Sequence, residues 1–143
     1  MRTFFKGFLG LTAALGAWLA QALGGWDAAL SMMFLLMGLD LLTGLLTSAA
    51  GRSDKTRGGT FLSTAFFLGL SRKLMMLALV ILAAALDRML NTAGVSRVAV
   101  IGFYAANEGL SIVENAALLG VPFPNGVLRM MERMRETEEE DGE

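Results

Sequence analysis

Four long apolar runs, separated by short polar segments, dominate the sequence. They cover residues 8–24, 28–50, 70–89 and 98–120. A helix that crosses a bilayer needs about 20 mostly apolar residues, and each run approaches or reaches that length. Because only helices and closed barrels satisfy their backbone polar groups in lipid, the pattern predicts an all-α membrane protein. We expect about four transmembrane helices in a single helical membrane domain, residues 1–135.

The run at residues 98–120 carries polar side chains that return every three or four residues. This spacing places them on one side of a helix, as a stripe made of Tyr104, Asn107, Ser111, Glu114 and Asn115, with Glu108 beside it. Glu108 falls near the middle of the run, where an acidic residue costs about 3 kcal/mol on insertion scales. We therefore expect the stripe to face another helix, another subunit or water. An interfacial or re-entrant helix would carry the same stripe, so three crossings plus such a helix is an alternative.

The run at residues 28–50 also has a narrow polar stripe. Its only charge, Asp40, lies near the middle, and Thr43, Gly44 and Thr47 share its side of a helix. Ionisable residues in membrane segments often line a helix contact or a water-filled lumen. Alternatively, Asp40 is protonated and hydrogen-bonded to a neighbour, and serves packing only. The candidate oligomerisation or pore-lining residues are Asp40, Thr43, Gly44, Thr47, Asn107, Glu108, Ser111, Glu114 and Asn115.

Small residues lie four apart in the first run, at Gly16, Ala20 and Gly24. Such a ladder lets helices approach closely, although any helix rich in alanine and glycine would contain one. The basic residues before this run also resemble the start of a cleaved secretory signal peptide. A second spanning run follows almost at once, so we expect the first run to remain as a helix.

Three residues are candidate anchors at the membrane–water interface. Trp26 lies in the glycine-containing turn after the first run, and its amphipathic ring suits headgroup depth. Arg72 and Lys73 stand at the start of the third run, from which long basic side chains can snorkel to the surface. For residues 60–70, just before them, we expect a separate helix that lies along the headgroups.

The C-terminal segment changes character after Pro122 and Pro124. Residues 127–135 alternate methionines with charged residues in the pattern of a short amphipathic helix. Residues 136–143 hold six of the thirteen acidic residues, and we expect this tail to be disordered because it has no apolar residue to bury.

The amino-acid composition argues against several classes of function. The chain of 143 residues is 55% hydrophobic with a mean hydropathy of +0.57, which is too apolar for an ordinary soluble domain. It has no cysteine and no histidine, which removes disulfides, thiol nucleophiles and the commonest zinc sites. Glu108 and Glu114 do not share a helix face, and no nucleophile stands beside a base. We expect no enzyme activity, no cofactor and no nucleic-acid partner.

The basic residues indicate an orientation. With four crossings, ten of the twelve lysines and arginines lie on the side of the two termini, and only Arg88 and Arg97 lie opposite. Positive residues favour the cytoplasmic side of a membrane. We therefore expect both termini in the cytoplasm of a bacterium, with a multi-pass domain in its cytoplasmic membrane.

Three motifs, in order along the chain, resemble a known family. They are Asp40-Leu41-Leu42-Thr43-Gly44, then Gly69-Leu70-Ser71-Arg72-Lys73, then Ala106 to Asn115 followed by Leu119-Gly120-Val121-Pro122-Phe123-Pro124. Together they span roughly residues 28 to 130 and are similar to the toxin-secretion and phage-lysis holins, bacteriophage holin family 4. The acidic C-terminus departs from the short basic or mixed end of that family.

The resemblance implies a holin, which associates with itself in the lipid bilayer and opens pores or lesions. Through these an endolysin, which is a cell-wall hydrolase, or a secreted toxin leaves the cell during lysis, without direct contact with the holin. The alternative is a small structural subunit of a larger integral-membrane complex, in which a partner protein satisfies the polar stripes permanently.

Overall fold

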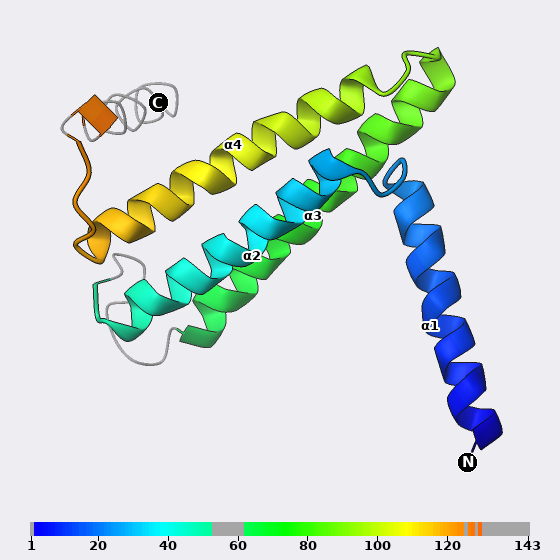
Figure 1. The fold of residues 1–143 in the computed structure, drawn as a ribbon, viewed down its shortest axis with the longest axis horizontal. Helices are drawn as coiled ribbons and strands as arrows, with labels where there is room; N and C mark the ends of the chain where they lie inside the picture. Colours follow the sequence, from blue (N-terminus) through cyan, green and yellow to red (C-terminus); the bar gives the residue numbers. More distant parts are fainter. Residues whose placement is uncertain (1, 53–61, 125, 128, 130–143) are drawn as a thin grey trace. The chain divides into compact units, whose positions relative to one another are not determined.

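Helices are the only regular elements in the residues that the computed structural model describes, which are 2–52, 62–124, 126, 127 and 129. The four elements, traced in Figure 1, are α1 (Arg2–Ala22), α2 (Ala28–Ala49), α3 (Leu62–Leu90) and α4 (Val95–Leu118). The predicted all-α class is confirmed for this part of the chain. Most of the predicted amphipathic helix at 127–135 and the whole tail at 136–143 lie outside the described residues.

Helix α3 corrects one detail of the sequence interpretation. The separate interfacial helix expected at residues 60–70 is not observed, because from Leu62 onward the segment is continuous with the apolar run. No proline interrupts it, and the single Gly69 costs only about 1 kcal/mol in a helix interior. Arg72 and Lys73 therefore lie well inside a long helix and not at the start of one.

The helix ends follow local chemistry. Gly24 and Gly25 have φ angles of 86° and 100°, in the left-handed region that favours glycine, and Gly25 donates a backbone bond of 2.8 Å to Ala20. Asp27 then starts α2, since its carboxylate accepts the Leu30 amide at 2.8 Å as an N-cap. The turn predicted after the first run is thus present.

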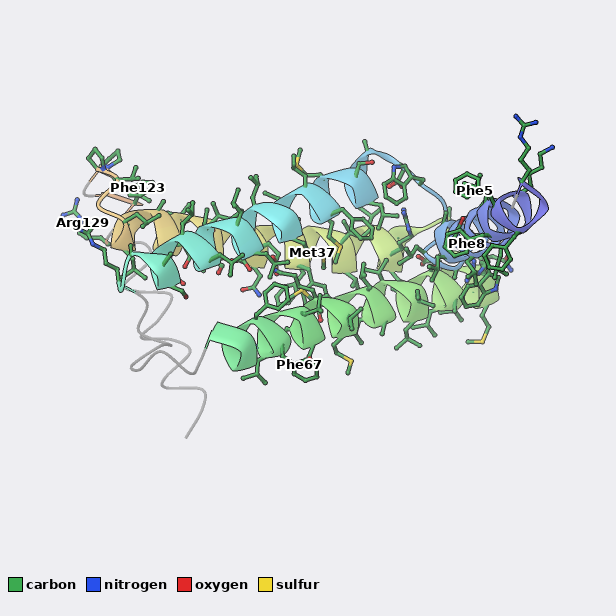
Figure 2. All side chains as sticks on the ribbon, turned by 90° about the horizontal axis from the view of Figure 1, so that it is seen from below. Phe5, Phe8, Met37, Phe67, Phe123 and Arg129 are labelled. Carbon is green, nitrogen blue, oxygen red and sulfur yellow. The ribbon has the colours of Figure 1, made fainter. Side chains whose placement is uncertain are left out.

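Two helical segments are long and apolar enough to cross a membrane, among the residues the structure describes. They are Ala28–Ala49 and Phe66–Leu90. Two of the four expected crossings meet this criterion by length and composition. Many large apolar side chains on all four helices are exposed, including Phe67, which projects from α3 in Figure 2. Exposed apolar surface on this scale is typical of a membrane protein.

The helices contribute to two compact units. The first is built from Met1–Phe34 and Leu70–Ala105, and the second from Leu35–Gly69 and Ala106–Glu143. The first has a core of large and small side chains, namely Leu23, Leu30, Met33, Val80, Ala83, Ala84 and Ile101. The second buries Met37 together with the polar residues Thr47 and Glu108.

Helix α1 makes few contacts along its length. The described side chains from Phe4 to Leu19 are all exposed, and Figure 2 shows Phe5 and Phe8 projecting from the helix. Contacts with the rest of the first unit begin only at its C-terminal end, where Leu23 is buried.

Candidate functional site

A polar cluster joins α2 and α4 in the second unit. The side-chain amide of Asn115 donates a hydrogen bond of 3.1 Å to the Thr43 hydroxyl and lies 3.4 Å from a carboxylate oxygen of Asp40. The Thr43 hydroxyl in turn donates to the Asp40 backbone carbonyl at 3.1 Å. These three candidate residues, which come from two separate motifs of the sequence, are therefore brought together within one chain.

Gly44 and Thr47 extend this cluster along α2. A Cβ atom at Gly44 would lie 3.8 Å from the Asn115 amide nitrogen, so the position is in contact with the cluster. Thr47 is 1% exposed and donates to the Gly44 carbonyl at 2.8 Å. A buried hydroxyl that bonds to its own helix needs no partner from a neighbour.

The rest of the predicted stripe on α4 is split between several environments. Glu108 is 3% exposed, Ser111 and Glu114 are half-buried, and Asn107 is exposed. The sequence pattern predicted one continuous polar face. The structure instead turns part of that face toward α2 and leaves Asn107 on the surface.

Arg52, just after α2, caps the C-terminal end of α4. Its guanidinium donates 3.0 Å to the Leu119 carbonyl and 3.4 Å to the Leu118 carbonyl. The last carbonyls of a helix have no partner within it and carry partial negative charge, so an arginine there is stabilising. In the sequence analysis this arginine is only one of the ten basic residues on the side of the termini.

A second polar cluster, which we call the arginine joint, lies in the first unit. It consists of Arg97, Asp27, Asp87 and Arg88 with the backbone carbonyls of Gln21, Leu23 and Gly25. Arg97 is buried, and its guanidinium donates to Asp27 at 2.6 Å, to the Gly25 carbonyl at 2.9 Å and to the Leu23 carbonyl. A buried arginine is tolerated because every contact is a charge-assisted hydrogen bond.

The Asp27 carboxylate is tuned by this arrangement. Hydrogen bonding to Arg97 lowers the pKa of Asp27 below its usual value, and the amide of Leu30 lowers it further. The side chain of Asp27 remains 47% exposed, so water shares in its solvation. This group is ionised at neutral pH and holds the arginine in place.

Asp87 and Arg88 complete the joint from the end of α3. Asp87 accepts the amides of Ser96 at 2.9 Å and Arg97 at 2.8 Å, and also the Thr92 hydroxyl, so a residue of α3 caps the first turn of α4. Arg88 donates 3.1 Å to the Gln21 carbonyl, at the end of α1. One end of each of the four helices therefore lies at the arginine joint, in the first unit.

Gly24 has a different place from the one expected. It was predicted on a ladder of small residues with Gly16 and Ala20, but it lies beyond the end of α1, in the turn. A Cβ atom at Gly24 would lie 2.6 Å from Cδ of Arg97. The residue makes room for the joint. Nothing lies within 4 Å of a Cβ at Gly16, and Ala20 is half-buried.

The three expected interface anchors also differ among themselves. Trp26 is exposed and stacks on Phe34, with ring centroids 5.4 Å apart. Arg72 is exposed, while Lys73 is buried inside the first unit. The sequence signal that pointed to Arg72 and Lys73, a basic pair before an apolar run, did not distinguish the two.

Sequence reasoning missed the joint. Arg88 and Arg97 were considered only as charges on the side opposite the termini, and no role was predicted for Asp87. The positions of these residues could have indicated the joint. Charged residues at both ends of a short turn between two apolar runs can cap neighbouring helices.

Comparison with known proteins identifies the family of the chain. The sequence profile of the bacteriophage holin family matches residues 17–136, most of the chain. A protein of Bacillus phage phi105 named "Probable holin" is 36% identical over 95 residues, 66% of this chain and 65% of that protein. The protein YqxH of Bacillus subtilis is 33% identical over 111 residues, 78% of this chain and 74% of that protein.

A further relative comes from Clostridium perfringens, a 14.9 kDa protein in the nagH 3' region. It is 30% identical over 122 residues, 85% of this chain and 87% of that protein. No solved structure matches the chain. The match covers all three motifs on which the resemblance rested, together with two membrane-capable helices. This chain is therefore a membrane protein that belongs to the bacteriophage holin family.

Proposed function

We propose that the protein is a holin that associates with itself in the cytoplasmic membrane of a bacterium and opens lesions there. A cell-wall hydrolase or a secreted toxin then leaves the cell through them. The observation that carries the proposal is the family match over residues 17–136, supported by a relative that is named a probable holin. Polar groups buried between otherwise apolar helices support the same reading.

The proposed topology has four crossings with both termini in the cytoplasm. The meeting of one end of every helix at the arginine joint supports it, because alternating crossings bring those four ends to the same face. The charge count supports it too. Arg88 and Arg97, the only basic residues assigned to the outer face, are bonded to carbonyls and carboxylates of the joint.

Opening would exchange bonds within one chain for bonds to water or to other copies. Asn115, Thr43 and Asp40 bind one another in the single chain, which lowers their cost in lipid. Interhelical hydrogen bonds in membranes are worth about 0.6 kcal/mol on average and at most about 2 kcal/mol. Hydrogen bonds of this strength can therefore stabilise a closed state and still break when many copies associate.

Induced expression in a bacterium tests the proposal. The gene is expressed with and without a cytoplasmic cell-wall hydrolase, and turbidity, uptake of an impermeant dye and release of a cytoplasmic enzyme are followed. We expect abrupt dye uptake with the protein alone and lysis only when the hydrolase is also present. A structural subunit of a larger complex would instead be degraded or remain inert, and sealed cells at high expression would refute the proposal.

A variant of the polar stripe tests the mechanism. Replacing Asn107 by Ala and Glu108 by Leu should leave insertion intact but delay or abolish dye uptake. The membrane fraction, assayed by immunoblot, controls for insertion. Uptake on the normal schedule would show that the stripe serves packing only.

A further inference from the structure

Two asparagines of α4 have opposite environments. Asn115 is half-buried and its amide binds Thr43. Asn107 is exposed and, in the part of the chain that the structure describes, its side chain makes no hydrogen bond. The same residue type on the same helix is thus satisfied at one position and open at the other.

The open amide needs a partner if α4 lies in a membrane. Lipid tails offer no hydrogen bond, so an exposed carboxamide in a bilayer is costly until another group reaches it. A carboxamide carries two donor hydrogens and an acceptor oxygen. The side chain that complements it most simply is therefore a second carboxamide.

The surface next to Asn107 suits contact with an uncharged helix. Ala106, beside Asn107 on α4, is also exposed, and Ser111, one turn further on, is half-buried. Of the charged residues on this part of the helix, Glu108 is 3% exposed and Glu114, two turns beyond Asn107, is half-buried. Two copies can therefore meet at Asn107 without a fully exposed charge beside the contact, which favours a second copy over a charged partner.

We infer that α4 of one copy packs against α4 of a second copy along this face, with the two Asn107 carboxamides hydrogen-bonded to each other. This deepens the proposed function, on which it rests for the placement of α4 in the bilayer. Asn115 serves the single chain, and Asn107 serves the contact between copies.

Cysteine cross-linking tests the contact. The natural chain has no cysteine, so Asn107→Cys and Asn115→Cys each place one thiol in the full-length protein. In bacterial membranes under mild copper-phenanthroline oxidation, we expect a disulfide-linked dimer from Asn107→Cys and at least about tenfold less from Asn115→Cys. Equal dimer from both positions, or none from position 107, would overturn the inference.

Two further measurements sharpen the result. Asn107→Ala should weaken self-association in lipid by about threefold to fifteenfold, and Asn107→Gln should restore most of it because the carboxamide is kept. If the thiol at position 107 reacts rapidly with a membrane-impermeant maleimide and forms no dimer, the residue faces water and the inference fails.

The outcome separates this contact from the proposed function. If the wild-type protein permeabilises cells but Asn107→Cys yields no disulfide-linked dimer, the α4 contact is refuted and the holin function stands. If Asn107→Cys yields the dimer but the wild-type protein leaves cells sealed, the holin function alone is refuted.

Discussion

Replacing Arg97 by methionine should destabilise the protein more than any other single change at the joint. Methionine keeps most of the aliphatic length but donates no hydrogen bond. The lost bonds include those to Asp27 at 2.6 Å, to Gly25 at 2.9 Å and to the Leu23 carbonyl. Each of these bonds involves a charged donor, and all three end on the segment that connects α1 to α2.

The magnitude follows from what each partner does afterwards. Removing one member of a fully buried ion pair costs about 3–5 kcal/mol, but Asp27 is 47% exposed and water can replace part of its bond. Bonds to charged groups are worth about 1.5–3 kcal/mol, and the Leu23 carbonyl belongs to a buried residue. We therefore expect a net loss of about 2–4 kcal/mol in the free energy of unfolding.

Arg88→Met is the matched control. Arg88 is exposed and makes one good bond, 3.1 Å to the Gln21 carbonyl, so its replacement should cost about 0.5–1 kcal/mol. Both variants would be unfolded with increasing SDS in mixed micelles, with helix content followed by circular dichroism. The reasoning fails if the stability of Arg97→Met lies within about 0.5 kcal/mol of the wild type, or if Arg88→Met is less stable than Arg97→Met. Either result would show that the joint does not stabilise the fold.

Three other changes test the turns. Ala93 has a φ of 52°, which costs a residue with a Cβ about 1 kcal/mol, so Ala93→Gly should stabilise the protein by about that amount in the same unfolding assay, and an unchanged midpoint would contradict the strain. The pKa of Asp27 is lowered from 3.8 in the folded protein, so its carboxylate adds stability above the unfolded pKa, and this stability is lost as the pH falls through the folded pKa. The wild type should therefore lose more stability than Asp27→Asn between pH 7 and pH 3, and parallel stability curves for the two proteins would refute this. Gly24→Ala would bring a Cβ within 2.6 Å of Arg97 at a positive φ and should cost about 2–3 kcal/mol of stability. Gly25→Ala also has a positive φ but meets nothing within 4 Å, so it should cost only about 1 kcal/mol. Equal losses of stability would show that contact with Arg97 is unimportant.

The sequence predicted the helices well because apolar length and turn residues are local signals. Helix α2 begins at Ala28, where the pattern placed it, since Gly24, Gly25 and Asp27 before it end one helix and start the next. The start of α3 was missed by several residues. Phenylalanines followed by a basic pair suit an interfacial helix and a continuous one equally, and only tertiary structure decides between them.

The candidate site was predicted in part. Asp40, Thr43 and Asn115 stood out because polar groups at helical spacing are unexpected in an apolar run, and the structure joins them. Helical spacing alone could not say which polar groups would face the same chain. Asn107 and Asn115 occupy the same predicted stripe and yet differ in exposure, because helix packing buries only one of them.

The three arginines Arg52, Arg88 and Arg97 all bind main-chain oxygens at helix ends. A carbonyl is contributed by every amino acid, so these bonds place no constraint of their own on the side chains at Gln21, Leu23 and Leu119. Pairwise covariation across relatives would therefore be nearly blind to them. Their trace in related sequences would be single positions, namely the arginines themselves and the glycine at position 24 that leaves space for one of them.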